Sequence, residues 1–253
     1  MSKPRNYQTE AIIIKKTKLG EADSILTLYT PYLGKIQGFA KSLRRPKSKL
    51  AGHLELLTHS QVSLARGRNL DTITGSQTIN SFLPLKSNLE LTSRALYVIE
   101  LVDQFTADHI ENYPLFQLLL ETMRNLCQAG NSELVLRYFE LQLLNQVGYR
   151  PQLYQCTSCR ATLEATTNSF CSAAGGMLCP NCSLSQPLTY SLSFNALRVL
   201  RVLQSSDYDT VSKLEINPEL SCELEGVMRD YLKYLLEREV KSVAWLDTLK
   251  GQA

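Results

Sequence analysis

Four cysteines carry the strongest chemical signal in this sequence. They form two C-x2-C pairs separated by nineteen residues: Cys156, Cys159, Cys179 and Cys182. A C-x2-C turn places two thiolates on one side of a tight loop, and two such turns complete a tetrahedron of sulfur around zinc. Because four protein ligands leave no position for water, the spacing predicts one structural Zn2+ ion and not a catalytic one.

The other three cysteines lack this spacing. Cys171 lies between the two pairs, and the sequence leaves open whether it contributes to the metal site. Cys127 and Cys222 fall within helical patterns of apolar residues, and we expect them to be core thiols. An odd number of cysteines with two close pairs favours thiolates bound to metal in a reducing compartment over a set of disulfides.

A second cluster of residues suits binding to a polyanion. The stretch 34–50 contains six Lys and Arg residues and no acid, and two further Arg residues follow a later strand pattern. We predict that the following side chains contact the phosphates of a polyanion: Lys35, Lys41, Arg44, Arg45, Lys47, Lys49, Arg66 and Arg68. Phe39 is the predicted base-stacking residue, with Tyr29 and Tyr32 as further candidates. A solvated lysine-rich loop is the alternative for such a run.

Charge is divided unevenly along the chain. Residues 1–80 carry a net charge of +8, whereas residues 81–253 carry −5. The N-terminal part therefore attracts a polyanion, since segregated charge raises the local concentration of the opposite charge. Contacts to phosphates predict binding that tolerates any sequence and weakens with salt.

Known catalytic motifs are missing from the sequence. It contains no phosphate-binding loop, no H-E-x-x-H motif, no G-x-S-x-G nucleophile turn and no paired deaminase motif. The three histidines, His53, His59 and His109, have no obvious nucleophile beside them. We therefore predict a protein that binds and does not catalyse.

The cationic residues fall within a series of short β-strand patterns. Five segments are apolar, β-branched or alternating, and turn residues separate them: 11–16, 24–29, 35–39, 61–64 and 72–79. Five strands in about 75 residues favour a partly open barrel of the OB-fold type, whose strand face and loops bind single strands. A small SH3-like barrel has the same strand count and is the structural alternative.

Near Ser81 the period of the apolar residues changes from two to 3.6, which indicates helices. We expect three of them over 91–105, 115–126 and 134–147, a fourth capped by Ser193 and a fifth after Asn217.

These elements predict an α+β protein with two domains. An OB-fold domain that binds nucleic acid covers 1–80, and a helical domain covers 81–253 with the zinc module inserted at about 150–190. The 253 residues are 44% hydrophobic and 20% charged, as in ordinary globular proteins. No apolar run reaches the roughly 18 residues of a membrane span, and no signal-peptide core is present, so we expect a cytoplasmic protein.

Several motifs resemble, in their order, those of the RecO family of bacterial DNA repair proteins. They are LGEADSILTLYT at 19–30, GK at 34–35, AK at 40–41, RRPKS at 44–48, a strand LELL at 54–57, and GG at 175–176 ahead of the second cysteine pair. The resemblance spans nearly the whole chain, and its N-terminal block is the most specific part. Ser42 departs from the Gly expected after Ala-Lys, which bears on the local turn.

This resemblance implies an N-terminal OB-fold, a helical C-terminal domain interrupted by a zinc-binding module, and a recombination mediator without nucleotide hydrolysis. It also implies binding to single- and double-stranded DNA and annealing of complementary strands. The implied partners are RecR, single-strand-binding protein and, indirectly, the recombinase RecA. The implied place is the bacterial cytoplasm, in association with the nucleoid.

Two other functions remain open on the residues alone. The four-cysteine module could make the chain a zinc-ribbon adaptor for RNA or the transcription machinery. A metal-dependent nucleic-acid hydrolase is the enzymatic alternative, against which the closed thiolate set and the lack of a carboxylate cluster count. If the resemblance extends to function, we expect the acidic helical part to bind the acidic, apolar-ended tail of single-strand-binding protein.

Overall fold

The computed structural model describes residues 5–128 and 130–250. The ends of the two predicted domains, 1–4 and 251–253, lie outside the described residues. The chain forms two units, one of Met1–Gln128 with Ser242–Ala253 and one of Ala129–Lys241.

Five strands of the first unit close into a barrel. They are β1 (Asn6–Leu19), β2 (Asp23–Thr30), β3 (Gly34–Ala40), β4 (His59–Ala65) and β5 (Asp71–Asn80). The order around the barrel is β1-β2-β3-β5-β4, with a parallel pair between β3 and β5 and antiparallel pairs elsewhere. All five predicted strands are present, and the predicted OB-fold is confirmed.

The long first strand pairs with two neighbouring strands, one along each half of its length. β1 pairs with β4 over 6–12 and with β2 over 12–19, and its register with β2 shifts between Ile13 and Lys15. Such an irregularity bends a strand and increases its twist, which lets one strand turn the corner of a small barrel. Ala11 and Ile13 of this strand point into a fully buried core with Leu26 and Leu28.

The basic loop between β3 and β4 is anchored to the barrel core. Leu43 and Leu54 are buried in that core, and a short 3-10 helix, Ala51–His53, lies between them. The strand expected at 54–57 is absent, and that prediction was wrong. Leu57 instead adopts a left-handed conformation with φ of 67°, and its N–H donates to the Ile13 carbonyl at 3.0 Å, which makes the segment a turn.

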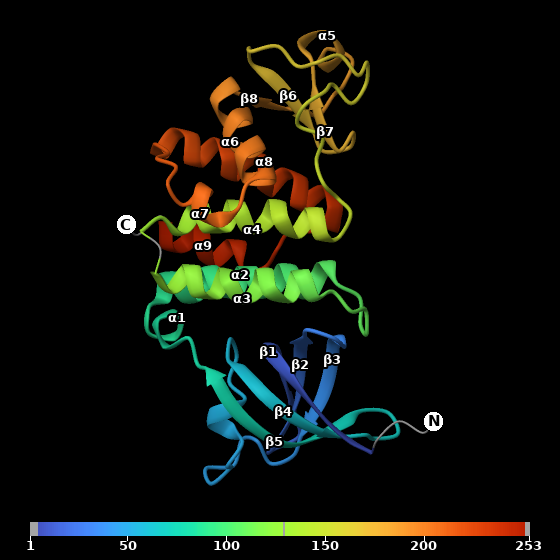
Figure 1. Cartoon of the computed structure of the whole chain (residues 1–253), viewed down its shortest axis with the longest axis vertical. Helices are drawn as coiled ribbons and strands as arrows, with labels where there is room; N and C mark the ends of the chain where they lie inside the picture. Colours follow the sequence, from blue (N-terminus) through green and yellow to red (C-terminus); the bar gives the residue numbers. More distant parts are fainter. Residues whose placement is uncertain (1–4, 129, 251–253) are drawn as a thin grey trace. The chain divides into compact units, whose positions relative to one another are not determined.

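Helices complete the first unit: α1 (Leu83–Ser87), α2 (Leu89–Phe105), α3 (Tyr113–Gln128) and α9 (Val243–Lys250). Figure 1 shows α2 and α3 across one end of the barrel. The ring of the buried Tyr29 stacks with that of Phe116 at 6.4 Å. α9 packs against α2, and the N–H of Ser242 donates to the Glu100 carboxylate at 2.8 Å.

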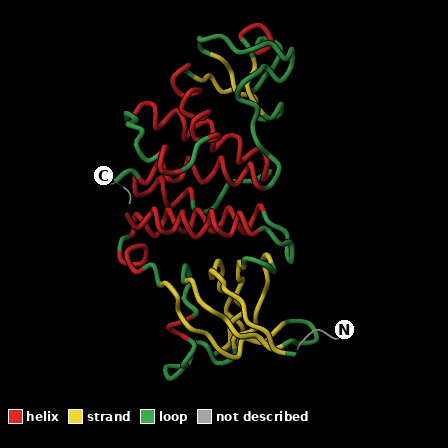
Figure 2. The backbone as a smooth tube through the Cα atoms, in the orientation of Figure 1, coloured by secondary structure: helices red, strands yellow, loops and turns green. Residues whose placement is uncertain are grey.

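The second unit combines helices with a small module. Its helices are α4 (Ser132–Gln146), α6 (Phe194–Ser205), α7 (Tyr208–Val211) and α8 (Pro218–Leu236). The module contains β6 (Asn168–Cys171), β7 (Gly176–Leu178), α5 (Pro180–Ser183) and β8 (Tyr190–Leu192), with sheet order β7-β6-β8 and long connecting loops (Figure 2). No described helix is long and apolar enough to cross a membrane.

The helix predictions hold for the long helices. α2, α3, α4, α6 and α8 lie where the apolar period predicts them, and the caps are as expected. Ser193 accepts a hydrogen bond from the Ala196 N–H at 3.2 Å, and Asn217 accepts one from the Leu220 N–H at 2.9 Å. The change of period near Ser81 coincides with the end of β5, whereas the units divide after Gln128, because α2 and α3 pack on the barrel.

Candidate metal centre and nucleic-acid interface

The first cysteine pair sits in a turn closed by its own backbone. The N–H of Arg160 donates to the Cys156 carbonyl and the N–H of Cys156 to the Ala161 carbonyl, both at 2.9 Å. Arg160 adopts a left-handed conformation with φ of 62°, which turns the chain back on itself directly after Cys159. The turn thus places both thiols on one side of the loop.

The second pair uses a short helical turn. Cys179 caps the start of α5, Pro180 occupies its first position, and Cys182 follows within it. The N–H of Ser183 donates to the Cys179 carbonyl at 3.0 Å. Pro suits a first helical position because its missing N–H would have no partner there, so Pro180, one of the two residues between the cysteines, also fixes their turn.

The glycine pair ahead of Cys179 joins the two halves of the module. The Gln152 N–H donates to the Gly175 carbonyl at 3.0 Å, and the Met177 N–H donates to the Gln152 carbonyl at 2.8 Å. A Cβ at Gly176 would overlap the Gln152 backbone, so only glycine allows this close approach. This contact explains the GG motif in physical terms.

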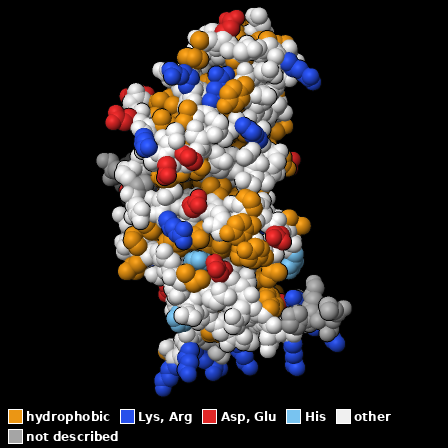
Figure 3. Space-filling model, in the orientation of Figure 1, with side chains coloured by type: hydrophobic (Ala, Val, Ile, Leu, Met, Phe, Trp, Pro, Cys, Tyr) orange, Lys and Arg blue, Asp and Glu red, His pale blue; other side chains and the backbone are white. Residues whose placement is uncertain are grey.

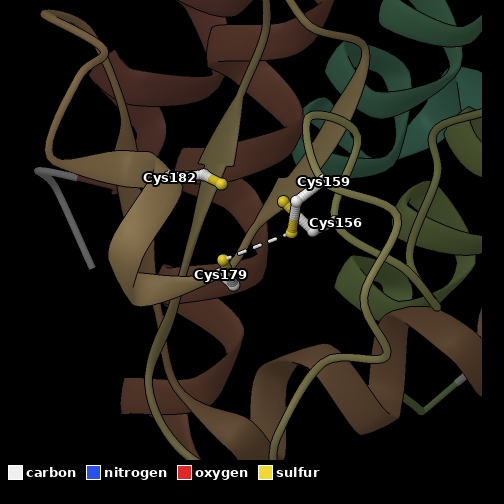
Figure 4. A group of neighbouring side chains, drawn as sticks. All are labelled: Cys156, Cys159, Cys179 and Cys182. Carbon is white, nitrogen blue, oxygen red and sulfur yellow. Dashed lines mark hydrogen bonds between the residues drawn. The ribbon is translucent and has the colours of Figure 1, made fainter.

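The four sulfur atoms converge (Figure 4). All lie within 4.8 Å of one another, and the Sγ atoms of Cys159 and Cys179 are 3.8 Å apart. Ligands about 2.3 Å from a tetrahedral ion are roughly 3.8 Å from each other, so the four cysteines fit a metal ion. Cys171 is buried in β6 outside this group.

The remaining two cysteines were predicted to be core thiols. Cys127 is half-buried, and burial raises the pKa of its thiol. Cys222 is exposed on α8, so the prediction was wrong for this residue. The apolar stripe of α8 runs through Leu224 and Val227, and Cys222 lies off that face.

Proton affinity differs among the grouped thiols. Burial disfavours the Cys156 thiolate, but backbone N–H groups stabilise it more and lower its pKa to about 6. They belong to Cys159, Cys179 and Ser158. The Ser158 hydroxyl favours the Cys182 thiolate, whereas hydrogen bonds shared with the other sulfurs raise the pKa of Cys182 to about 12. A bound divalent cation favours the thiolate at every position of such a group.

Most of the predicted DNA-binding cations lie on two loops of the barrel. The pairs Leu19–Asp23 and Ser24–Ala40 place the β1–β2 turn beside the loop after β3, whereas the β4–β5 hairpin lies at the start of β1, where Asn6 pairs with Ala65. Figure 3 shows a row of Lys and Arg side chains along the edge of the barrel opposite α2 and α3. We call the cations of the end of β1, the loop after β3 and the β4–β5 hairpin the basic end: Lys16, Lys18, Lys41, Arg44, Arg45, Lys47, Lys49, Arg66 and Arg68.

Most side chains of the basic end are free. Lys41, Arg45, Lys47, Lys49 and Arg68 are exposed, and none of them forms an ion pair within the part of the chain that the structure describes. Arg44 differs because it is half-buried. Its N–H donates to the Ala22 carbonyl at 2.9 Å and its guanidinium donates to the Gly20 carbonyl, so it also holds the loop in place.

Sequence reasoning did not select Lys16 and Lys18. Both are exposed, and both lie beyond the irregularity of β1. Two lysines separated by one residue at the end of a strand pattern gave the only signal, because such residues share a face.

Lys35 does not belong to the basic end, and the structure corrects that prediction. It is buried, and its ammonium donates to the Asp103 carbonyl at 2.6 Å and to the Asp103 carboxylate at 3.2 Å, with Asp108 at 3.7 Å. Lys15 contacts the same carboxylate at 3.0 Å. Burial disfavours the Asp103 carboxylate, but the two lysines outweigh it and lower its pKa. Lys35 therefore ties the barrel to α2.

The aromatic candidates fall into three environments. Phe39 is half-buried on the outer face of β3, beside Ile25 and Thr72 of the neighbouring strands. Tyr29 is fully buried against α3 and is not available for stacking on a base, which corrects that suggestion. Tyr32 is 63% exposed and stacks on Tyr113 at 5.4 Å.

Comparison with known proteins gives the family. A family model described as Recombination protein O N terminal matches residues 1–82, and one described as Recombination protein O C terminal matches residues 86–244. The chain belongs to the RecO family. It therefore has a role in DNA repair.

Relatives of similar length support this assignment, and each is named DNA repair protein RecO. The protein of Dehalococcoides mccartyi strain CBDB1 is 48% identical over 99% of this chain and 98% of its own length. The protein of Roseiflexus sp. strain RS-1 is 42% identical over 97% of this chain and 87% of its own length. The protein of Desulforamulus reducens is 32% identical over 96% of this chain and 94% of its own length.

The position at which this RecO chain departs from the expected glycine has a strained backbone. Ser42 has φ of 53°, in the left-handed region that glycine adopts at low cost. Its N–H donates to the Asp23 carboxylate at 2.6 Å, which fixes the start of the basic loop against the β1–β2 turn. Serine thus adopts here a backbone conformation that glycine would adopt at lower cost.

Proposed function

We propose that this RecO protein is a recombination mediator. It binds single- and double-stranded DNA through the basic end, anneals complementary strands and, with RecR, helps to load RecA onto DNA coated by single-strand-binding protein. The observation that carries the proposal is the set of exposed cations on the loops of an OB-fold that form no ion pair among the described residues. We propose that it does so without covalent catalysis, in the bacterial cytoplasm at the nucleoid.

The mechanism is electrostatic. Lys41, Arg45, Lys47, Lys49 and Arg68 neutralise phosphates, and released counterions supply much of the binding free energy. Phosphate contacts carry no sequence information, so two complementary strands are held equally well. Annealing follows because cations between the strands reduce their mutual repulsion. Phe39 offers its half-exposed ring to a base at the edge of this surface.

The four-cysteine group is proposed to hold one zinc ion. Four thiolates in a tetrahedron suit zinc, and with no open position the ion supplies structure alone. Cys156 and Cys159 would hold it from one turn, and Cys179 and Cys182 from the other. The ion would then link two turns that are otherwise joined by the backbone hydrogen bonds of Gln152 and Thr157 to the segment 175–177.

Charge reversal at Arg45 and Lys47 tests the DNA-binding proposal. These residues are exposed and their backbone is anchored by Leu43 and Leu54, so Arg45→Glu with Lys47→Glu should leave the fold intact. Affinity should fall for every sequence, and the slope of log affinity against log salt should shrink by about one per lost contact for a duplex and by roughly 0.7 for a single strand. Fluorescence anisotropy across a salt series measures both quantities.

Lys213→Glu, at an exposed position of the second unit, is the matched control and should leave the slope unchanged. An unchanged affinity and slope in the Arg45 and Lys47 variant would show that the basic end does not bind DNA.

The second unit is proposed to receive protein partners. Residues 129–241 contain 10 Lys and Arg against 12 Asp and Glu, a net charge of −2, so they do not attract phosphates as residues 1–80 do, and grooves between amphipathic helices accept apolar segments. We expect the acidic, apolar-ended tail of single-strand-binding protein to protect amides within Ala129–Lys241 from hydrogen exchange in the full chain. The same peptide with its apolar end replaced by Ser is the control, and protection confined to the barrel would contradict this assignment.

A further inference from the structure

The first unit contains a cavity of about 630 Å3 at an opening in the barrel wall. β3 pairs with β5 only at Gly38 and Phe39, and nearer its start Lys35 is bridged to Asp108 in the loop after α2. Ile36 and Gln37 lie between these bridges and face the cavity, which we call the notch. Its size falls within the roughly 300–1,000 Å3 of ligand pockets.

Both walls of the notch are fixed by short-range contacts. On one side, Asp71 accepts hydrogen bonds from the Tyr7 hydroxyl at 2.6 Å and from the Gly67 N–H at 3.1 Å, which holds the β4–β5 hairpin. On the other side, the His109 N–H donates to the Lys35 carbonyl at 2.9 Å. The notch is therefore formed before any ligand binds, which lowers the entropic cost of binding.

The same loop lies directly against the turn between β2 and β3. A Cβ at Gly34 would overlap the carbonyl of Ile110, so the backbones touch there. Gly34 also has φ of 63°, and both features require glycine at this position. The sequence motif at 34–35 thus supplies the close contact and the ion pair that hold this wall.

One wall presents a flat, cationic platform. The guanidinium of Arg66 lies 4.8 Å from the ring centre of Tyr7. Burial raises the pKa of Tyr7 and the bond to Asp71 adds to the shift, so the ring stays neutral. Stacked guanidinium and phenol planes are surfaces on which nucleobases stack.

The other groups in the notch suit the edge of a base. Gln37 and Asn69 are exposed amides with both donors and acceptors, and Asp108 adds a carboxylate that accepts from base N–H groups. Arg68 of the hairpin is exposed and also lines the notch, so it can receive an adjoining phosphate. Such a polar lining disfavours an apolar peptide, because its buried polar groups would lose their partners.

We infer that the notch is a nucleobase-binding subsite that takes one unpaired base, with the adjoining phosphates on Arg66 and Arg68. The inference rests on the proposed DNA binding and adds a means of selecting single strands. A base within a duplex is stacked and paired, so it would have to leave the helix to enter. The basic end attracts both forms of DNA, and the notch favours the single strand.

An oligothymidine of about 12 nucleotides and a matched strand of abasic sites test this inference, because both carry the same phosphates. The ratio of their dissociation constants at fixed salt isolates the base contribution. Wild-type protein should bind the base-bearing strand about tenfold more tightly, as one stacked base provides. Tyr7→Leu should lower this ratio from about ten to about two. Gln37→Ala should lower it from about ten to about three.

Arg45→Ala is the matched control outside the notch. It should weaken binding of both strands and leave their ratio unchanged, since it removes only a phosphate contact. Because Gln37 is exposed, Gln37→Ala should not affect folding. It therefore tests the notch even if Tyr7→Leu lowers the melting temperature.

A ratio near one in wild type, or a wild-type ratio in both notch variants, would overturn the subsite even if Arg45→Ala weakens DNA binding. If neither strand binds, or Arg45→Ala and the charge reversal have no effect, the proposed function itself fails.

Discussion

The basic end and the four-cysteine group hold their ligating atoms in different ways. At the cysteines, backbone hydrogen bonds and a tight glycine contact bring four sulfurs within 4.8 Å of one another. At the basic end, long side chains extend from anchored loops, and their charged ends share only a surface. A site of the first kind selects an ion by geometry, whereas a site of the second kind selects a polyanion by charge density.

Removing the metal ligands should give the largest effect and separate the two sites. Cys156→Ser with Cys179→Ser should abolish metal binding, because binding free energies of about 10–16 kcal/mol in structural zinc sites depend on the full thiolate set. The sheet of β6, β7 and β8 should then exchange its amide hydrogens faster. DNA binding by the basic end should change less than twofold, since it lies in the other unit.

Metal analysis and hydrogen exchange provide the two measurements. Cys222→Ser, at an exposed thiol outside the group, should retain the ion. Less than half an equivalent of zinc in wild-type protein purified without chelator, or full occupancy in the double variant, would contradict the assignment.

Lys35 and Lys41 provide the next comparison, within the barrel itself. Lys35→Ala should lower the free energy of unfolding by about 2–3 kcal/mol, because it leaves the Asp103 carboxylate with fewer partners at a partly buried position. Lys41→Ala should cost less than about 0.5 kcal/mol and should weaken DNA binding instead. Urea unfolding and anisotropy measure the two effects, and equal destabilisation by both variants would refute the distinction.

The pH dependence sharpens the same comparison. Lys15 and Lys35 hold the pKa of Asp103 below its unfolded value of about 3.9, so its contribution is fully present above that pH. The contribution is lost as the pH falls through the lower pKa of the folded state. Hence the difference in unfolding free energy between wild type and Asp103→Asn should be constant above about pH 5 and should shrink below about pH 4.

The smallest expected effect concerns the turn that begins the basic loop. Ser42→Gly should relieve the left-handed strain but should also increase the entropy of the unfolded chain. The net gain in unfolding free energy should lie between zero and about 1 kcal/mol. Thermal unfolding can measure this gain. Ser212→Gly is the control: Ser212 has φ of −61°, which any residue adopts without strain, so glycine there should only increase the entropy of the unfolded chain and destabilise the protein. A loss of stability in Ser42→Gly would mean that strain is not the dominant cost at this turn.

The sequence by itself determined the five strands, the long helices and the cysteine group. These features depend on local patterns: alternation for strands, a 3.6-residue period for helices, and C-x2-C spacing that fixes ligand geometry within one turn. The cluster of cations at 41–49 was also predictable, because a loop of this composition remains in contact with water.

Only the tertiary structure decided which cations are free. Lys35 alternates with buried residues on β3 like any outward-facing side chain, yet the packing of α2 across the barrel covers it and provides Asp103 as its partner. The division after Gln128, the exposure of Cys222 and the notch beside Gln37 arise in the same way. Each depends on contacts between segments distant in the chain, and local periodicity carries no information about which segments meet.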